Sequence, residues 1–252
     1  MRFIAFFLIV LVVVVIGPAL MVFSSDVRLG QHWYSADRDS AGLAPDPGST
    51  PEAVVQIYAA RAFDWRGLFA VHTWIATKPA GASQYDVHEV TGWGRRALHS
   101  GPGLPDRNWF GATPRVWLDV RGPAAGRAIA QINAALADYP FADTYRAWPG
   151  PNSNTFVAWI VRRVPELAVA LPANAIGKDW LADGALASAP SGTGFQWSLY
   201  GLMGMMFARS EGVEINLFGL VWGIDVGNPA IKWPGIGRIG QPEPAVGHSP
   251  AS

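Results

Sequence analysis

Two histidines are the residues whose types and spacing could perform acid–base chemistry. His72 lies in the apolar run 69–76 (FAVHTWIA), where a buried imidazole must find partners. The segment 78–83 (KPAGAS) predicts a turn centred near Ala80, which would place His88 opposite His72. Cross-strand neighbours on one face lie about 5 Å apart, so one imidazole could orient the other and fix its tautomer. The alternative is a pair of hydrogen-bonded histidines without chemistry.

The candidate nucleophile is Ser153, in the segment 148–156 (WPGPNSNTF) that precedes an apolar helical stretch. Asn and Ser are preferred helix caps, so capping alone explains this composition. A helix N-terminus also presents N–H donors to a developing oxyanion. Ser153 could therefore act as a nucleophile, with His72 as its general base and His88 as the orienting residue. Candidate substrate contacts are Asn152, Asn154, Tyr145 and Arg146.

Strands and helices must position these residues. Residues 53–58, 68–76 and 85–93 are rich in β-prone residues or alternate polar and apolar ones, which predicts strands. Residues 123–138 and 154–164 carry apolar residues at helical spacing, which predicts helices. These elements indicate an α+β body, an antiparallel sheet with a few packed helices.

The block 194–225 is unusual because both of its faces become apolar around 202–207 and 218–222. Residues 195–199 and 213–217 alternate as strands do. Such a hairpin is either fully buried or lies against a membrane. Burial is favoured because the body needs a core.

The amino-terminal segment 3–23 holds no charged residue, and about 20 such residues suffice to cross a bilayer. A small-x-small cleavage site is missing before Ser24, which favours an uncleaved anchor over a cleaved signal peptide. Arg2 then indicates a cytoplasmic amino terminus. We therefore expect membrane contact through residues 3–23 and a body that faces the periplasm or cell exterior.

Composition and segment boundaries complete the predicted organisation: a transmembrane signal anchor (1–25), a linker (26–51), a single α+β domain (52–240) and a disordered tail (241–252). Lys and Arg (19) balance Asp and Glu (19), which argues against a nucleic-acid partner. The absence of cysteine excludes disulfides and thiolate sites. The histidines show no metal-ligand spacing, so we expect no metal and no cofactor.

Several strings resemble the bacterial family known as domain-of-unknown-function 3750: AVVQIYAARAF (53–63), FAVHTWIATKPAGA (69–82), ADTYRAWPGPNSNTF (142–156), AIGKDW (175–180), APSGTGFQWSL (189–199) and PGIGRIG (234–240). This resemblance implies no activity, since none is assigned to that family.

A more remote resemblance is to circularly permuted papain-like proteins, the group of lecithin retinol acyltransferase. It rests on the order of His72, His88 and the Asn152-Ser153 pair that opens a helix. It implies a permuted papain-like fold and an ester or amide hydrolase or acyltransferase. Ser153 stands where that group has its nucleophilic cysteine, and a serine hydroxyl is a far weaker nucleophile.

Two functions follow from these observations. The first is a membrane-anchored envelope hydrolase or acyltransferase that uses serine in place of cysteine. The second is a non-catalytic envelope module that binds a partner or lipid through its apolar, Trp-rich carboxy-terminal half. The sequence does not identify the substrate or the envelope partner.

Overall fold

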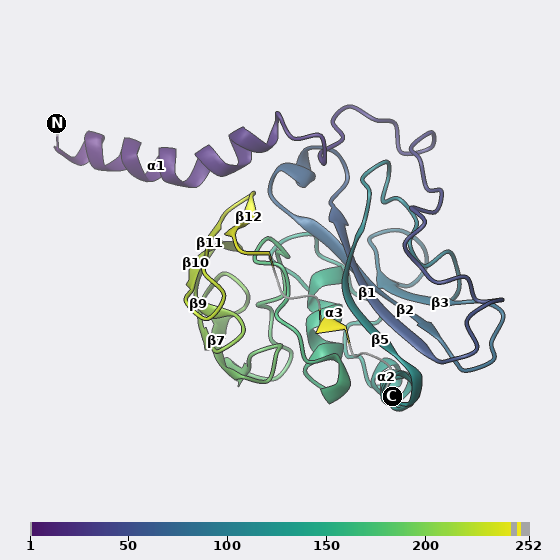
Figure 1. Ribbon diagram of the computed structural model, residues 1–252. Coiled ribbons are helices and arrows are strands. Elements are labelled where there is room, and N and C mark those ends of the chain that lie inside the picture. The colour runs from purple at the N-terminus through teal and green to yellow at the C-terminus, as the bar shows by residue number, and fades with distance from the viewer. Residues whose placement is uncertain (1, 243–245, 248–252) are drawn as a thin grey trace.

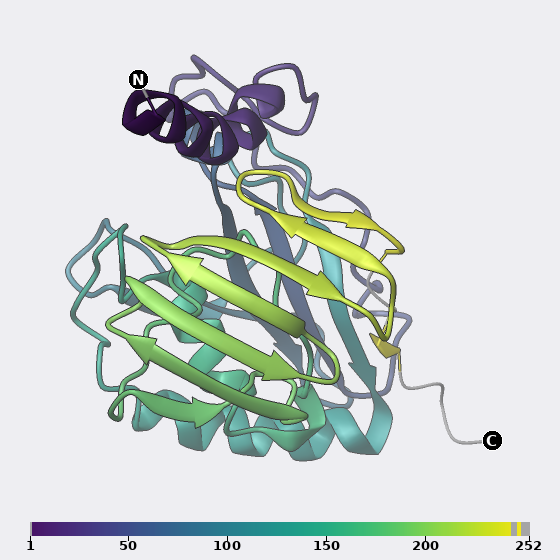
Figure 2. The ribbon, with the colours of Figure 1, turned by 90° about the vertical axis from the view of Figure 1, so that its left-hand side faces the viewer.

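Two sheets lie on either side of a short helix in the computed structural model, which describes residues 2–242 and 246–247 (Figure 1). The helices are α1 (Arg2–Met21), α2 (Gly122–Ala137) and α3 (Ser153–Val161), with short 3-10 turns η1 (Asp64–Leu68) and η2 (Pro165–Leu167). Helix α3 lies between the sheets, and α1 extends away from the body (Figures 1 and 2).

The first sheet has the order β13-β5-β1-β2-β3-β4. Its strands are β1 (Val54–Arg61), β2 (Val71–Lys78), β3 (Asp86–Val90), β4 (Leu98–Pro102), β5 (Arg115–Arg121) and β13 (Val246–Gly247). All neighbours are antiparallel except β13 and β5, which are parallel.

The second sheet is an antiparallel meander with the order β12-β11-β10-β9-β8-β7-β6. Its strands are β6 (Leu186–Ser188), β7 (Gly194–Leu199), β8 (Met203–Ala208), β9 (Gly212–Leu217), β10 (Leu220–Asp225), β11 (Ala230–Trp233) and β12 (Gly237–Gly240). Figure 2 shows this sheet from its outer side.

Both faces of the first sheet are buried. On one face Ile57 and Ile75, which pair directly, pack in a core with α2 and α3. On the other face Tyr58 pairs with Trp74, and this pair packs against residues of the 26–51 segment and the 104–112 loop. Full burial of each large side chain contributes about 1.5–3 kcal/mol, which explains the near-continuous apolar runs of β1 and β2.

The helices begin and end where local chemistry favours it. Helix α2 carries Pro123 in its first turn, where a missing N–H costs nothing. The side chain of Asn152 accepts hydrogen bonds from the backbone N–H groups of Asn154 and Thr155, which forms a capping box with Thr155. The predicted strands 53–58, 68–76 and 85–93 and both predicted helices are therefore confirmed, with shifted ends.

The predicted fold class is wrong in two respects. The body contains two mostly antiparallel sheets with three helices, not one sheet with helices packed on it. The expected transmembrane helix is also not supported: within residues 2–242 and 246–247, the structure contains no helix with the length and apolar character that a membrane crossing requires. The last turns of α1 pack against the body instead, where Gly17, Pro18 and Met21 are buried.

The segment 26–51, expected to be a linker, lies along the body. The Asp106 carboxylate accepts hydrogen bonds from the Ser40 hydroxyl and from the backbone N–H groups of Leu43 and Ala44. Most of the tail 241–252, expected to be disordered, falls outside the described residues. Of its described residues, 241–242 and 246–247, the pair Val246–Gly247 forms β13 and pairs with β5.

Candidate functional site

The register of β2 and β3 separates the two histidines that were expected to meet. His88 pairs with Ile75, so its side chain lies on the helix-covered face of the first sheet. His72 is three residues from Ile75 and therefore points to the opposite face. The predicted contact between His72 and His88 is wrong.

His72 belongs to a buried cluster that the sequence did not reveal. Its Nε2 lies 3.1 Å from Oε2 of Glu89, whose Oε1 accepts a 2.7 Å hydrogen bond from Arg107. The His72 ring stacks on Trp109 with 3.5 Å between ring centroids. Burial lowers the pKa of His72, although Glu89 opposes the shift. The neutral imidazole can thus donate to Glu89, and the cluster fastens the 104–112 loop to the sheet.

His88 is hydrogen-bonded on both ring nitrogens. Its Nε2 lies 2.9 Å from Oγ1 of Thr77, and its Nδ1 lies 2.8 Å from Oγ of Ser100. Burial lowers the pKa of His88 to about 4. An imidazole with so low a pKa is a weak general base at neutral pH. The hydrogen bonds to Thr77 and Ser100 therefore indicate a structural role for His88.

Ser153 lies at the start of α3 and is buried. Among the described residues, no hydrogen bond joins it to His72 or His88, so the structure does not assemble the expected triad. The side chains of Asn152 and Asn154 are used internally. Asn152 donates to the carbonyls of Ala147 and Ile176, and Asn154 donates to those of Val71 and Ile176. Catalysis by Ser153 stays a prediction.

Tyr145 and Arg146 lie in the exposed stretch before this turn. The Tyr145 ring lies against Gly92, where an added Cβ would come within 2.7 Å of the ring. The backbone N–H of Arg146 donates to the carbonyl of Pro151. The role of both residues as substrate contacts stays a prediction.

The second sheet carries an outer surface that is apolar over all of its strands. We call this surface the apolar face; its exposed members are Leu186, Phe195, Trp197, Leu199, Met203, Met205, Phe207, Ile215, Leu217, Ile224, Ile231 and Ile239, each 37–66% exposed. Antiparallel sheets usually present polar residues to solvent and apolar ones to the core. Here the arrangement is reversed.

The strand registers make the apolar face continuous. One row of directly paired residues crosses the whole sheet: Ile239, Ile231, Ile224, Val213, Phe207, Phe195 and Ser188. A second row contains Trp222, Ile215, Met205, Trp197 and Leu186, and a third contains Leu220, Leu217, Met203 and Leu199. No charged side chain interrupts these rows.

The inner side of the same sheet is polar and buried. Glu214 accepts hydrogen bonds of 2.6 Å from both Lys178 and Lys232, and Lys178 also contacts Asp179 at 3.2 Å. Burial alone would raise the pKa of Glu214, but the two lysines outweigh it and hold that pKa below its usual value. Glu214 is therefore held as a carboxylate ion inside the protein.

The model of a family described as a protein of unknown function (DUF3750) matches residues 52–180. The chain belongs to this family. No curated protein and no solved structure matches it, so the likeness to papain-like proteins is not confirmed.

The range matched by the DUF3750 model contains β1 to β5, α2 and α3, and it ends at Trp180. The apolar face begins at Leu186 and thus lies outside the matched range of this DUF3750 protein. The DUF3750 match therefore says nothing about the function of the apolar face.

Sequence reasoning missed which side of the second sheet faces the body. The block 194–225 was expected to be buried, yet one of its faces is exposed. The alternation in β7 (GFQWSL) and β9 (GVEINL) was a usable signal, because Gln196, Glu214 and Asn216 all fall on one side. Their partners Lys178 and Asp179 lie in a distant loop, so the pattern alone did not reveal that the polar side faces inward.

Proposed function

We propose that the protein is a non-catalytic module that docks on a lipid surface through its apolar face. The observation that carries the proposal is the uninterrupted set of exposed apolar rows across β6 to β12. Soluble monomers rarely expose contiguous apolar patches beyond a few hundred Å², and larger patches mark protein or membrane contacts.

The chemistry of the apolar face favours lipid over a protein partner. Protein interfaces carry about one hydrogen bond per 100–200 Å² and are anchored by residues such as Arg and Tyr. The rows of the apolar face offer side-chain hydrogen-bonding groups only at Ser188 and at the Trp197 indole, since the Trp222 indole nitrogen is buried. A hydrocarbon layer needs no such partners.

Helix α1 adds apolar surface on the same side. It leaves the body on the side to which the second sheet presents its outer surface (Figures 1 and 2). Leu11, Val12, Val15, Ile16 and Leu20 of α1 are exposed. A projecting helix with exposed apolar residues and an apolar sheet surface on the same side of the body are met more simply by a continuous lipid surface than by a single protein partner.

The test uses the fact that the chain contains no cysteine. A single cysteine introduced as Ile215→Cys and labelled with an environment-sensitive fluorophore reports on the centre of the apolar face. The full chain is mixed with neutral phosphatidylcholine vesicles that contain a nitroxide-labelled lipid. We expect a blue shift and quenching at position 215.

The matched control is Leu104→Cys, which is equally exposed (44% against 43% for Ile215) but lies in the first sheet's covering loop. The label at 104 should be neither shifted nor quenched. An unquenched label at 215 on vesicle-bound protein would refute the proposal. A change at 215 that depends on protein concentration without vesicles would show instead that the face binds a second copy of the chain.

A further inference from the structure

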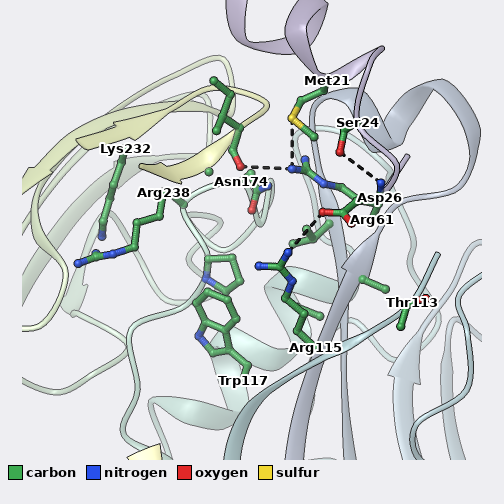
Figure 3. A pocket seen from close by; sticks show the side chains of 17 residues that line it. Met21, Ser24, Asp26, Arg61, Thr113, Arg115, Trp117, Asn174, Lys232 and Arg238 are labelled. Atoms are coloured by element: carbon green, nitrogen blue, oxygen red, sulfur yellow. Dashed lines mark hydrogen bonds and ion pairs between the residues drawn. The ribbon is translucent and has the colours of Figure 1, made fainter. Parts of the chain in front are cut away.

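A cavity at the junction of α1, the first sheet and the second sheet has the features of a small-molecule site (Figure 3). Its volume is about 360 Å³, within the ~300–1,000 Å³ range of ligand pockets. At ~30 Å³ for a water-sized group, it would hold about a dozen non-hydrogen atoms. None of the residues of the apolar face lines it.

Arg61 supplies a partly buried positive charge to this cavity. Its guanidinium donates to the carbonyls of Gly67, Gly235 and Ile236, all of them neutral groups. Among the described residues, no carboxylate forms an ion pair with it. Burial lowers the pKa of Arg61 to about 10, which reflects the cost of holding this cation away from water.

Arg115, on the neighbouring strand β5, points into the same space (Figure 3). Its only ion pair in the described chain is with Asp26, at 3.4 Å, and both side chains are more than half exposed. The proximity of Arg115 adds to the lowering of the Arg61 pKa, while Asp26 opposes it. These three groups together leave one excess positive charge.

The other cations that line the cavity are already neutralised. Lys232 pairs with Glu214 at 2.6 Å, and Arg238 pairs with Asp225 at 3.0 Å. The excess charge is therefore concentrated between Arg61 and Arg115.

The remaining wall is largely apolar. It is formed by Met21, Ala59, Val71, Trp117 and Pro172. The Trp117 indole is held in place by a 2.6 Å hydrogen bond from its Nε1 to the carbonyl of Ala170. A rigid apolar wall beside an excess of positive charge suits a ligand that is apolar at one end and anionic at the other.

We propose that this cavity binds a small amphiphile, with an anionic carboxylate or phosphate group between Arg61 and Arg115 and a short apolar chain against Met21 and Trp117. Arg115 can donate charge-assisted hydrogen bonds to such an oxyanion through its planar fork. The terminal nitrogens of Arg61 already donate to three carbonyls and to the Met21 sulfur, so Arg61 contributes its positive charge and its Nε–H. The proposal is independent of lipid-surface docking, since its test needs no vesicle.

Calorimetric titration of the full chain with octanoate, octyl phosphate, 1-octanol and inorganic phosphate tests the proposal. Octanoate or octyl phosphate should bind saturably at one site, and the tighter of the two identifies the head group. The proposal would be overturned if 1-octanol or inorganic phosphate bound as tightly as octanoate and octyl phosphate. It would also be overturned if neither octanoate nor octyl phosphate bound.

Substitutions of two exposed residues, Arg115 and Asp26, should change ligand binding in opposite directions. Arg115→Gln removes one anion donor and should weaken binding roughly 10- to 100-fold. Asp26→Asn removes the carboxylate that competes for Arg115 and should tighten binding several-fold. The control is Arg127→Gln, which breaks the ion pair between Arg127 and Glu166. No residue of α2 lines the cavity, so this variant should leave binding unchanged. Equal affinities in the Arg115 and Asp26 variants would contradict the proposal.

Discussion

Replacing Glu214 by glutamine should destabilise the protein by about 3–5 kcal/mol, because it leaves buried charge uncompensated. The Glu214 side chain is 3% exposed and lies 2.6 Å from the Nζ atoms of both Lys178 and Lys232. The amide of glutamine keeps an acceptor but carries no charge. Asp179 would then be the carboxylate left beside Lys178, and Lys232 would have none in this cluster.

The measurement is urea or thermal unfolding of the full chain at pH 7. For a chain of this size the expected loss corresponds to a melting-temperature decrease of roughly 6–20 °C. Asp183→Asn breaks the exposed Arg163–Asp183 pair by a similar chemical change and should cost less than about 1 kcal/mol. If the Glu214 variant lost no more stability than the Asp183 variant, the reasoning would be refuted.

A second variant separates charge imbalance from lost packing. Combining Glu214→Gln with Lys232→Met removes one charge of each sign and leaves Lys178 with Asp179. Replacing buried ions by apolar groups is often neutral, so much of the stability lost in the single variant should return. A double variant that is less stable than the single one would show that the contacts of Lys232 matter more than its charge.

The pH dependence of this effect has a definite sign. The two lysines hold the pKa of Glu214 below its usual value against the opposing effect of burial. Such a carboxyl contributes stability above its unfolded pKa of about 4.3, and that contribution is lost as the pH falls through the folded pKa. The difference in unfolding free energy between wild type and Glu214→Gln should therefore be full at pH 7 and shrink as the pH falls below about 4.

Three further outcomes are expected. Asn152→Ala removes the cap of α3 and should lower the unfolding free energy by about 1–2 kcal/mol in urea titrations. Gly212→Ala should cost at least about 1 kcal/mol in the same assay, because Gly212 has a φ of 74° and its added Cβ would lie 2.2 Å from the Ile224 carbonyl oxygen. Binding to neutral vesicles should not weaken between about 50 and 500 mM salt, since the apolar face carries no charge; a steep loss in flotation would point to charged residues instead.

Strands β1, β2 and β3 of the first sheet could be predicted from the sequence, whereas β4, β5 and the hairpin register were not. Burial on both faces makes β1 and β2 continuous apolar runs, which are readable locally. The pairing of His88 depends on the centre of the connection between β2 and β3. That connection runs from Pro79 to Tyr85, and no short turn motif fixes its centre. The shift from the assumed centre placed the two histidines on opposite faces.

The site expected at Ser153 illustrates the limit of residue types as a signal. Asn, Ser and Thr at a helix start serve capping and catalysis equally well. Here Asn152 and Asn154 use their side chains to hold α3 against Val71 and the loop at Ile176. Capping and catalysis are distinguished only by whether a base lies beside the serine in the folded protein. That position depends on the register of β2 and β3.

The inverted second sheet explains how a large apolar surface can coexist with a defined fold. Strand side chains alternate with a period of two, so a slip of one residue in β9 would turn Glu214 and Asn216 outward and Ile215 inward. Lys178 and Asp179 bind those two polar residues from the body and thereby oppose such a slip. The apolar side must then face outward wherever the inner network is formed. Stability and docking are consequently separable: substitutions at the inner network should lower the unfolding free energy, whereas substitutions at exposed positions such as Ile215 should lower lipid contact and leave stability nearly unchanged.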